Sequence, residues 1–69
     1  MQVHHIHLTT RDRVLRAWQN TMELIRDYQL YAGEVSDPAA SALFSKLAEE
    51  EGFHAAALHD WLVEAEKEA

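Results

Sequence analysis

A long apolar stripe that contains an acid and a histidine is the feature that most limits how this chain can fold. Residues spaced about 100° apart, as on an α-helix, place seven side chains within roughly 60° of Glu51: Phe44, Leu47, Ala48, His54, Ala55, Leu58 and Leu62. An ionised carboxylate buried in such a stripe costs on the order of several kcal/mol unless it is paired, protonated or bound to a metal. We therefore expect a helix whose buried face must supply a partner for Glu51.

Capping signals divide the chain into two helices. Thr9 and Asp12 have the spacing of a capping box, which predicts a first helix that begins near Thr10 and covers residues 10–35. Asp37 is a good N-cap and Pro38 suits the first helical position, so a second helix is expected over residues 38–66. Residues 1–9 are expected to form an N-terminal arm. The sequence thus predicts a single all-α domain over residues 1–69, folded as an antiparallel two-helix hairpin.

The first helix carries more apolar surface than one partner helix would cover. Leu15, Trp18 and Met22 form a second apolar strip beside the one centred on Tyr28. A chain of 69 residues without cysteine is also near the limit at which one core is stable alone. We expect a homodimer, or a higher homo-oligomer, in which two hairpins form a four-helix bundle.

Composition excludes several classes of function. Twelve acidic and six basic residues give a net charge of −6, which is the wrong sign for a nucleic-acid binder. We find no stretch suited to a membrane span and no signal peptide, and therefore expect a cytoplasmic protein without a membrane partner. Cysteine is absent and the serines lie near no convincing base, so nucleophilic catalysis is not expected.

Glu51 and His54 are the candidate metal ligands. Their Glu-x-x-His spacing places an oxygen and a nitrogen donor on adjacent turns of one helix face. Carboxylate-bridged di-iron and di-manganese bundles take this half-site from each of two helices. A two-fold axis would bring the half-sites of two chains together, so one motif per chain would suffice.

Residues 20–62 resemble the rubrerythrin and ferritin-like superfamily, and most closely its short encapsulated-ferritin type. The similarity is carried by Tyr28, the Asp37-Pro38 turn, and Glu51-x-x-His54 followed by small residues and a leucine. The resemblance implies a bundle of dimerised hairpins with iron as cofactor, Glu51 and His54 as ligands, and Tyr28 beside the metal. It also implies iron oxidation or peroxide reduction, and an encapsulating shell protein as partner.

One position departs from that family. A further ligand glutamate is expected on the first helix, seven residues before Tyr28, where this chain has Thr21. A dimer would then offer two glutamates and two histidines, which suit one divalent ion such as iron, zinc or manganese, with water completing the coordination. Thr21 could hydrogen-bond a ligand or a bound water. We accordingly expect metal binding with weak ferroxidase or peroxidase-like turnover at most.

Two other interpretations remain open. The chain could be a metal-free helical dimerisation module on a degenerate ferritin-like scaffold, in which Glu51 and His54 hydrogen-bond each other across the dimer. The arm could instead hold a metal through His4, His5 and His7, although an arm without fixed chemistry is the simpler interpretation. For Tyr28, a packing role is as well supported as a role near the metal.

Overall fold

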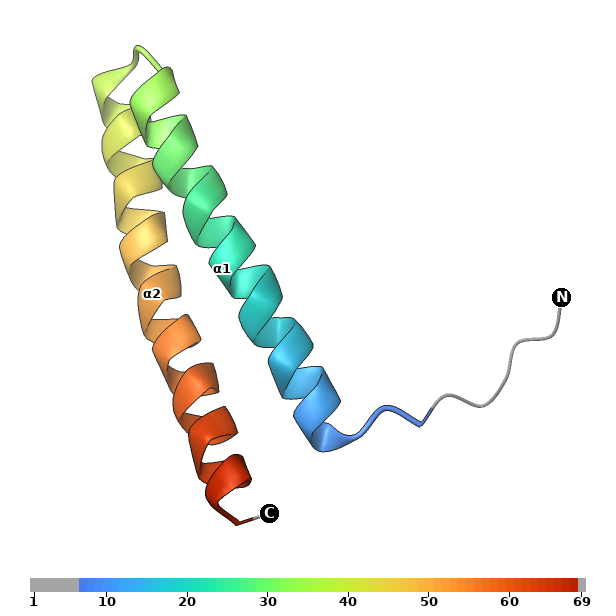
Figure 1. The fold of residues 1–69 in the computed structure, drawn as a ribbon. Coiled ribbons are helices and arrows are strands. Elements are labelled where there is room, and N and C mark those ends of the chain that lie inside the picture. The colour runs from blue at the N-terminus through green and yellow to red at the C-terminus, as the bar shows by residue number, and fades with distance from the viewer. Residues whose placement is uncertain (1–6, 69) are drawn as a thin grey trace, which may run out of the picture.

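The structure, a computed structural model, describes residues 7–68, and within them the chain forms an antiparallel hairpin of two helices (Figure 1). Helix α1 spans Thr10–Glu34 and helix α2 spans Pro38–Lys67. The prediction of an all-α helix hairpin is confirmed. Each observed helix differs by one residue, at its C-terminal end, from the range expected from the sequence, which is the usual uncertainty where a helix frays.

Helix α1 begins with the expected capping box. The Thr9 hydroxyl accepts a hydrogen bond from the Asp12 backbone N–H, and the Asp12 carboxylate accepts one from the Thr9 N–H, each at 3.0 Å. These bonds satisfy backbone donors that the first turn leaves without helical partners. The helix ends at Glu34, where Val35 is extended and its N–H donates to the Tyr31 carbonyl.

Helix α2 begins directly after a short connection. The Asp37 carboxylate accepts from the Ala40 N–H at 3.2 Å, and Pro38 occupies the first turn, where its missing N–H costs nothing. The residue before a proline avoids helical backbone angles, which separates the two helices. The Ser41 hydroxyl donates to the Ala32 carbonyl at 2.7 Å and ties the start of α2 to the end of α1.

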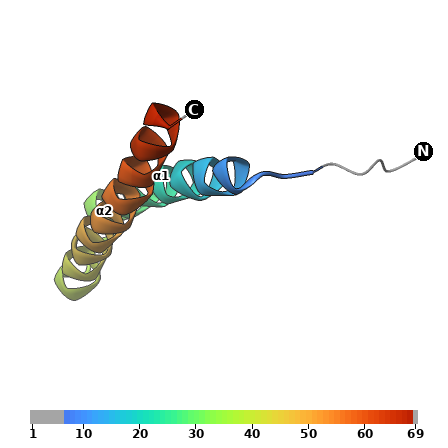
Figure 2. The same ribbon diagram turned by 90° about the horizontal axis from the view of Figure 1, so that it is seen from below.

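Few side chains are buried between the helices. In residues 7–68 only Ala48, Ala55 and Leu62 are buried, and their spacing of seven follows the heptad seam along which two helices pack. The helices lie side by side near the turn and cross at an angle, so that their free ends diverge (Figure 2). The thinnest principal extent is 11 Å. The hairpin is therefore a single layer of helices without a second layer to cover it.

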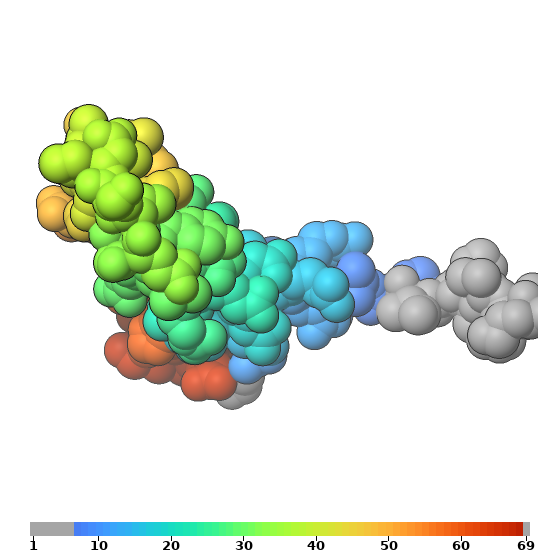
Figure 3. Space-filling model, turned by 90° about the horizontal axis from the view of Figure 1, so that it is seen from above, coloured from blue at the N-terminus to red at the C-terminus, as the bar shows by residue number. Residues whose placement is uncertain are grey.

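Contacts along the hairpin fix which residues of α1 and α2 lie at the same level. Near the turn, the Tyr28 and Phe44 rings stack with centroids 6.1 Å apart, and near the free ends Arg11 pairs with Glu66 at 3.3 Å. Between them, the Trp18 and His59 rings lie 5.8 Å apart. Figure 3 shows the two helices in contact, seen from the turn end. The helices of residues 7–68 include none that is both long and apolar enough to traverse a lipid bilayer.

We predict that Asp37→Ala lowers the free energy of unfolding by about 1 kcal/mol, because the Ala40 N–H loses its capping partner. Urea or thermal unfolding at fixed protein concentration measures the change. The control is Asp60→Ala in the exposed middle of α2, which should leave stability unchanged or slightly raised. Equal effects of the two substitutions would contradict the capping role.

A second prediction concerns acid. Hydrogen bonds from the Thr9 N–H and hydroxyl hold the pKa of the Asp12 carboxyl below its ordinary value of 3.8. Because the folded-state pKa is the lower one, the stabilisation is complete above the unfolded value and is lost as the pH falls through the folded value. Asp12→Asn should therefore lessen the loss of stability on acidification, followed by urea unfolding at a series of acidic pH values. Asp60→Asn is the matched control and should keep the wild-type pH dependence.

Candidate metal centre

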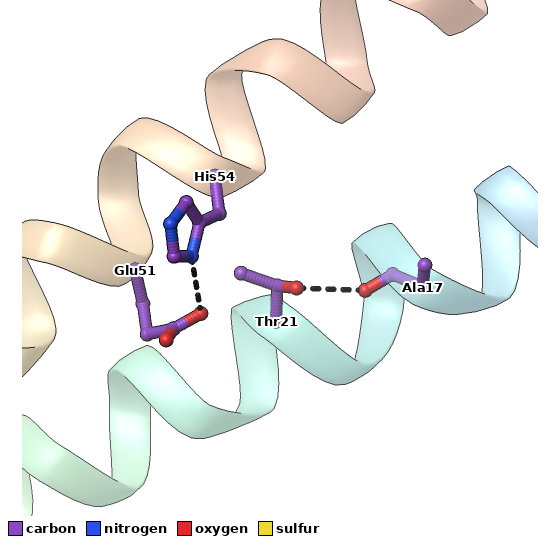
Figure 4. Close-up of polar contacts among 4 residues, drawn as sticks. All are labelled: Ala17, Thr21, Glu51 and His54. Atoms are coloured by element: carbon purple, nitrogen blue, oxygen red, sulfur yellow. Dashed lines mark hydrogen bonds and ion pairs between the residues drawn. The ribbon is translucent and has the colours of Figure 1, made fainter.

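Glu51 and His54 lie in contact on one face of α2. The Nδ1 atom of His54 is 3.2 Å from the Oε1 atom of Glu51, within hydrogen-bonding distance. Figure 4 shows both side chains extending from α2 toward α1. The helical spacing of three therefore brings the two donor atoms together, as the sequence predicted.

The separation of these donor atoms fits ligands of a single metal ion. Ligand atoms roughly 2.0–2.2 Å from a zinc-like ion are roughly 2.8 to 3.6 Å apart at octahedral to tetrahedral angles. The observed 3.2 Å falls in that interval. One hairpin nevertheless supplies too few ligands, because residues 7–68 contain no group of three acidic or histidine side chains placed to hold a metal.

The two candidate ligands differ in their exposure. The Glu51 side chain is 24% exposed and that of His54 is 67% exposed. The sequence placed both in a buried stripe, but a single partner helix covers only the Glu51 side of it. Burial of His54 would thus require a further partner.

Thr21 lies on α1 at the level of Glu51, on the side that faces α2 (Figure 4). Its hydroxyl donates to the Ala17 carbonyl at 2.8 Å, one turn earlier in the same helix. This bond occupies its only donor and leaves the oxygen lone pairs free to accept. Thr21 is thus placed near the candidate ligands, where it could accept a hydrogen bond from a bound water.

Tyr28 lies farther along the hairpin. Its ring stacks on Phe44, which precedes Glu51 by seven residues, or about 10 Å along α2. Tyr31 contacts the same ring edge-on, with centroids 5.4 Å apart. This aromatic cluster gives Tyr28 a packing role in the hairpin, and the role near a metal stays a prediction.

Several large apolar side chains remain exposed on one side of the hairpin. On α2, Leu43 and Trp61 are displaced from the nearest buried residue in the same sense as His54, Trp61 by roughly 100° and Leu43 by roughly 140°. On α1, which has no buried residue, Leu24 and Tyr31 are displaced in that sense by roughly 60° from the line through Thr21 and Tyr28. We call these five residues the open face.

The two halves of the open face lie on the same side of the molecule. Trp18 and His59 are both displaced in the opposite sense on their helices, and their rings meet 5.8 Å apart. Displacements of one sense on α1 and α2 therefore share a side of the hairpin. His54 lies within an apolar surface that neither helix of its own chain covers.

The arm histidines are only partly described. His4 and His5 lie outside the described residues, and His7 is exposed just before α1. The prediction of an arm metal site stays untested.

The sequence did not identify the Trp18–His59 pair or the open face. The second apolar strip of α1, which includes Trp18, lies on the side of the hairpin opposite the open face. The helical angles of Leu43 and Trp61 contained the necessary signal, but the side that they share with α1 emerges only once the helices are paired.

Comparison of the chain with protein-family models, with curated proteins and with solved structures finds no match. The ferritin-like resemblance accordingly rests on the residues and motifs that carry it.

Proposed function

We propose that two copies of this hairpin associate through their open faces into a four-helix bundle that binds a divalent metal ion. Glu51 and His54 of both copies are the ligands. The single observation that carries this proposal is the contact of Glu51 and His54 at 3.2 Å beside an uncovered apolar surface.

The exposed apolar side chains support association. Leu43 is 53% exposed and Trp61 is 41% exposed, although each is among the larger apolar residues of the chain. Burial of such side chains contributes about 25 cal/mol per Å² removed from water. A hairpin with only three buried side chains among its described residues gains much of its stability from such a partner.

The charges of the ligands favour one ion for each pair of chains. Two carboxylates neutralise one divalent cation, whereas two cations in a low-dielectric interior would be left with excess positive charge. Iron is the metal that the ferritin-like resemblance favours, and zinc and manganese accept the same donors. The protein is thus proposed as a metal-binding ferritin-like dimer.

The residues of the chain have distinct roles in this proposal. Glu51 supplies negative charge and an oxygen donor, and His54 supplies a neutral nitrogen donor. Thr21 accepts a hydrogen bond from a ligand or water, which would orient it. Bound iron would supply electron transfer to oxygen or peroxide, and with Thr21 in place of a carboxylate we expect that turnover to be weak.

One observation favours a second function. The Glu51–His54 contact already gives each group a hydrogen-bonding partner within one helix, without a metal. The two functions differ in whether metal changes the stability of the dimer.

We predict one divalent ion for each two chains in protein purified without a histidine tag, as measured by elemental analysis. Glu51→Ala should abolish this stoichiometry, whereas Glu50→Ala, one residue away and exposed, should preserve it.

Metal should also raise the melting temperature of the wild type but not of Glu51→Gln. A ligand at 100 times its Kd adds about 2.7 kcal/mol to the free energy of unfolding. A melting temperature indifferent to both metal and chelator would favour the metal-free module.

We also predict that Leu43→Glu raises the dimer Kd at least about tenfold, because two carboxylates would enter the apolar interface. Analytical ultracentrifugation over a concentration series measures the constant. Phe53→Glu is the matched control, because Phe53 is 69% exposed on the outer side of α2, away from the open face. A larger effect at Phe53 than at Leu43 would place the interface on the outer side of α2 and contradict association through the open face.

A further inference from the structure

The charges on the two helices are unevenly divided. Helix α2 contains two lysines and six acidic residues, whereas α1 contains four arginines and four acidic residues. A dimer that placed α2 directly beside the α2 of its partner would bring two strongly acidic helices together. Contact between α1 and the partner's α2 avoids this repulsion.

Two outward charges of opposite sign lie at one level near the turn. Asp27 is exposed on the outer edge of α1, and Lys46 is exposed on the outer edge of α2. Their level lies between that of the Tyr28–Phe44 stack and that of Glu51. Among the described residues they form no ion pair with each other, because they occupy opposite edges of one hairpin.

A second such pair lies near the free ends, with the signs exchanged. Arg13 on α1 and Glu64 on α2 lie at a level between the Arg11–Glu66 ion pair and the Trp18–His59 contact. The Arg13 guanidinium donates to the Leu8 carbonyl, and Glu64 contacts Lys67 at 3.5 Å, so each is satisfied only by a close neighbour in sequence.

A two-fold axis parallel to the helices would bring both pairs together. Rotation about such an axis leaves every residue at its own level and exchanges the two edges of the hairpin. Asp27 then lies across the rim from the partner's Lys46, and Arg13 lies across it from the partner's Glu64. One like-charged pair, Glu23 with Glu50, lies between them, so opposite charges outnumber like charges along each rim.

We infer that the partner on the open face is a second copy of this chain, packed with α1 of each copy against α2 of the other. The inference rests on the proposed dimer and adds its arrangement. Glu51 lies between the line of buried residues and the open face, so in this arrangement both copies of Glu51 point toward the bundle axis from diagonally opposite helices.

Cysteine cross-linking tests this arrangement directly, because the native chain contains no cysteine. The double variant Asp27→Cys/Lys46→Cys, treated with a short bismaleimide, should give covalent dimers on a denaturing gel. Each single variant should give few, because its two copies lie on opposite rims. All substituted residues are exposed, and circular dichroism checks that the variants keep their helices.

Glu50→Cys distinguishes the alternative arrangement. Where α2 packs beside the partner's α2, the two copies of residue 50 come close and should cross-link with each other. Efficient cross-linking of Glu50→Cys, or its absence in the double variant, would overturn the inference. The proposed function would survive either result if one metal ion is still bound for each two chains. A wild type that remains monomeric in the ultracentrifuge would overturn both.

Charge exchange gives an independent measurement. Asp27→Lys should raise the dimer Kd about threefold to tenfold, because two rim attractions become repulsions. Asp27→Lys/Lys46→Asp should return the Kd to within about twofold of the wild type. A double variant as weak as the single one would contradict pairing of these residues across the rim.

Discussion

The central constraint on this molecule is that two helices alone form a single layer and cannot cover their own apolar faces. An amphipathic helix packed against one partner buries only part of its apolar surface, and the remainder meets water unless another layer covers it. Here the seam holds two alanines and one leucine, while leucine, tyrosine and tryptophan side chains remain exposed on one side. One hairpin by itself therefore leaves apolar surface in contact with water.

The same constraint explains the state of the candidate ligands. Glu51 lies close to the seam and is largely covered by α1, whereas His54 lies on the uncovered side. Their contact gives each group a hydrogen-bonding partner, and the Glu51 carboxylate stays partly exposed to water. Full burial of an ionised carboxylate would cost a single small chain much of its stability. A second hairpin would remove water from this pair, and a metal ion bound there would then stabilise the buried Glu51 carboxylate. Metal binding and association would in that case stabilise one another.

The uneven distribution of charge gives the proposed association a direction. Apolar surface is non-directional and accepts several alignments of two hairpins with similar burial. Rim charges weigh little individually, but they penalise arrangements that bring like charges together. The acidic character of α2 and the opposite signs of Asp27 and Lys46 at one level favour one alignment over another.

Local signals in the sequence determined the secondary structure of this chain. The Thr9–Asp12 capping box and the Asp37–Pro38 turn act within a few residues, and the structure contains both. The adjacency of Glu51 and His54 follows from helical periodicity alone. Only the pairing of the helices decided which apolar residues are buried, which residues of α2 lie level with Thr21 and Tyr28 of α1, and which side of the hairpin stays open. These properties depend on the register and crossing of two segments distant in sequence, and the periodicity of either segment by itself does not contain them.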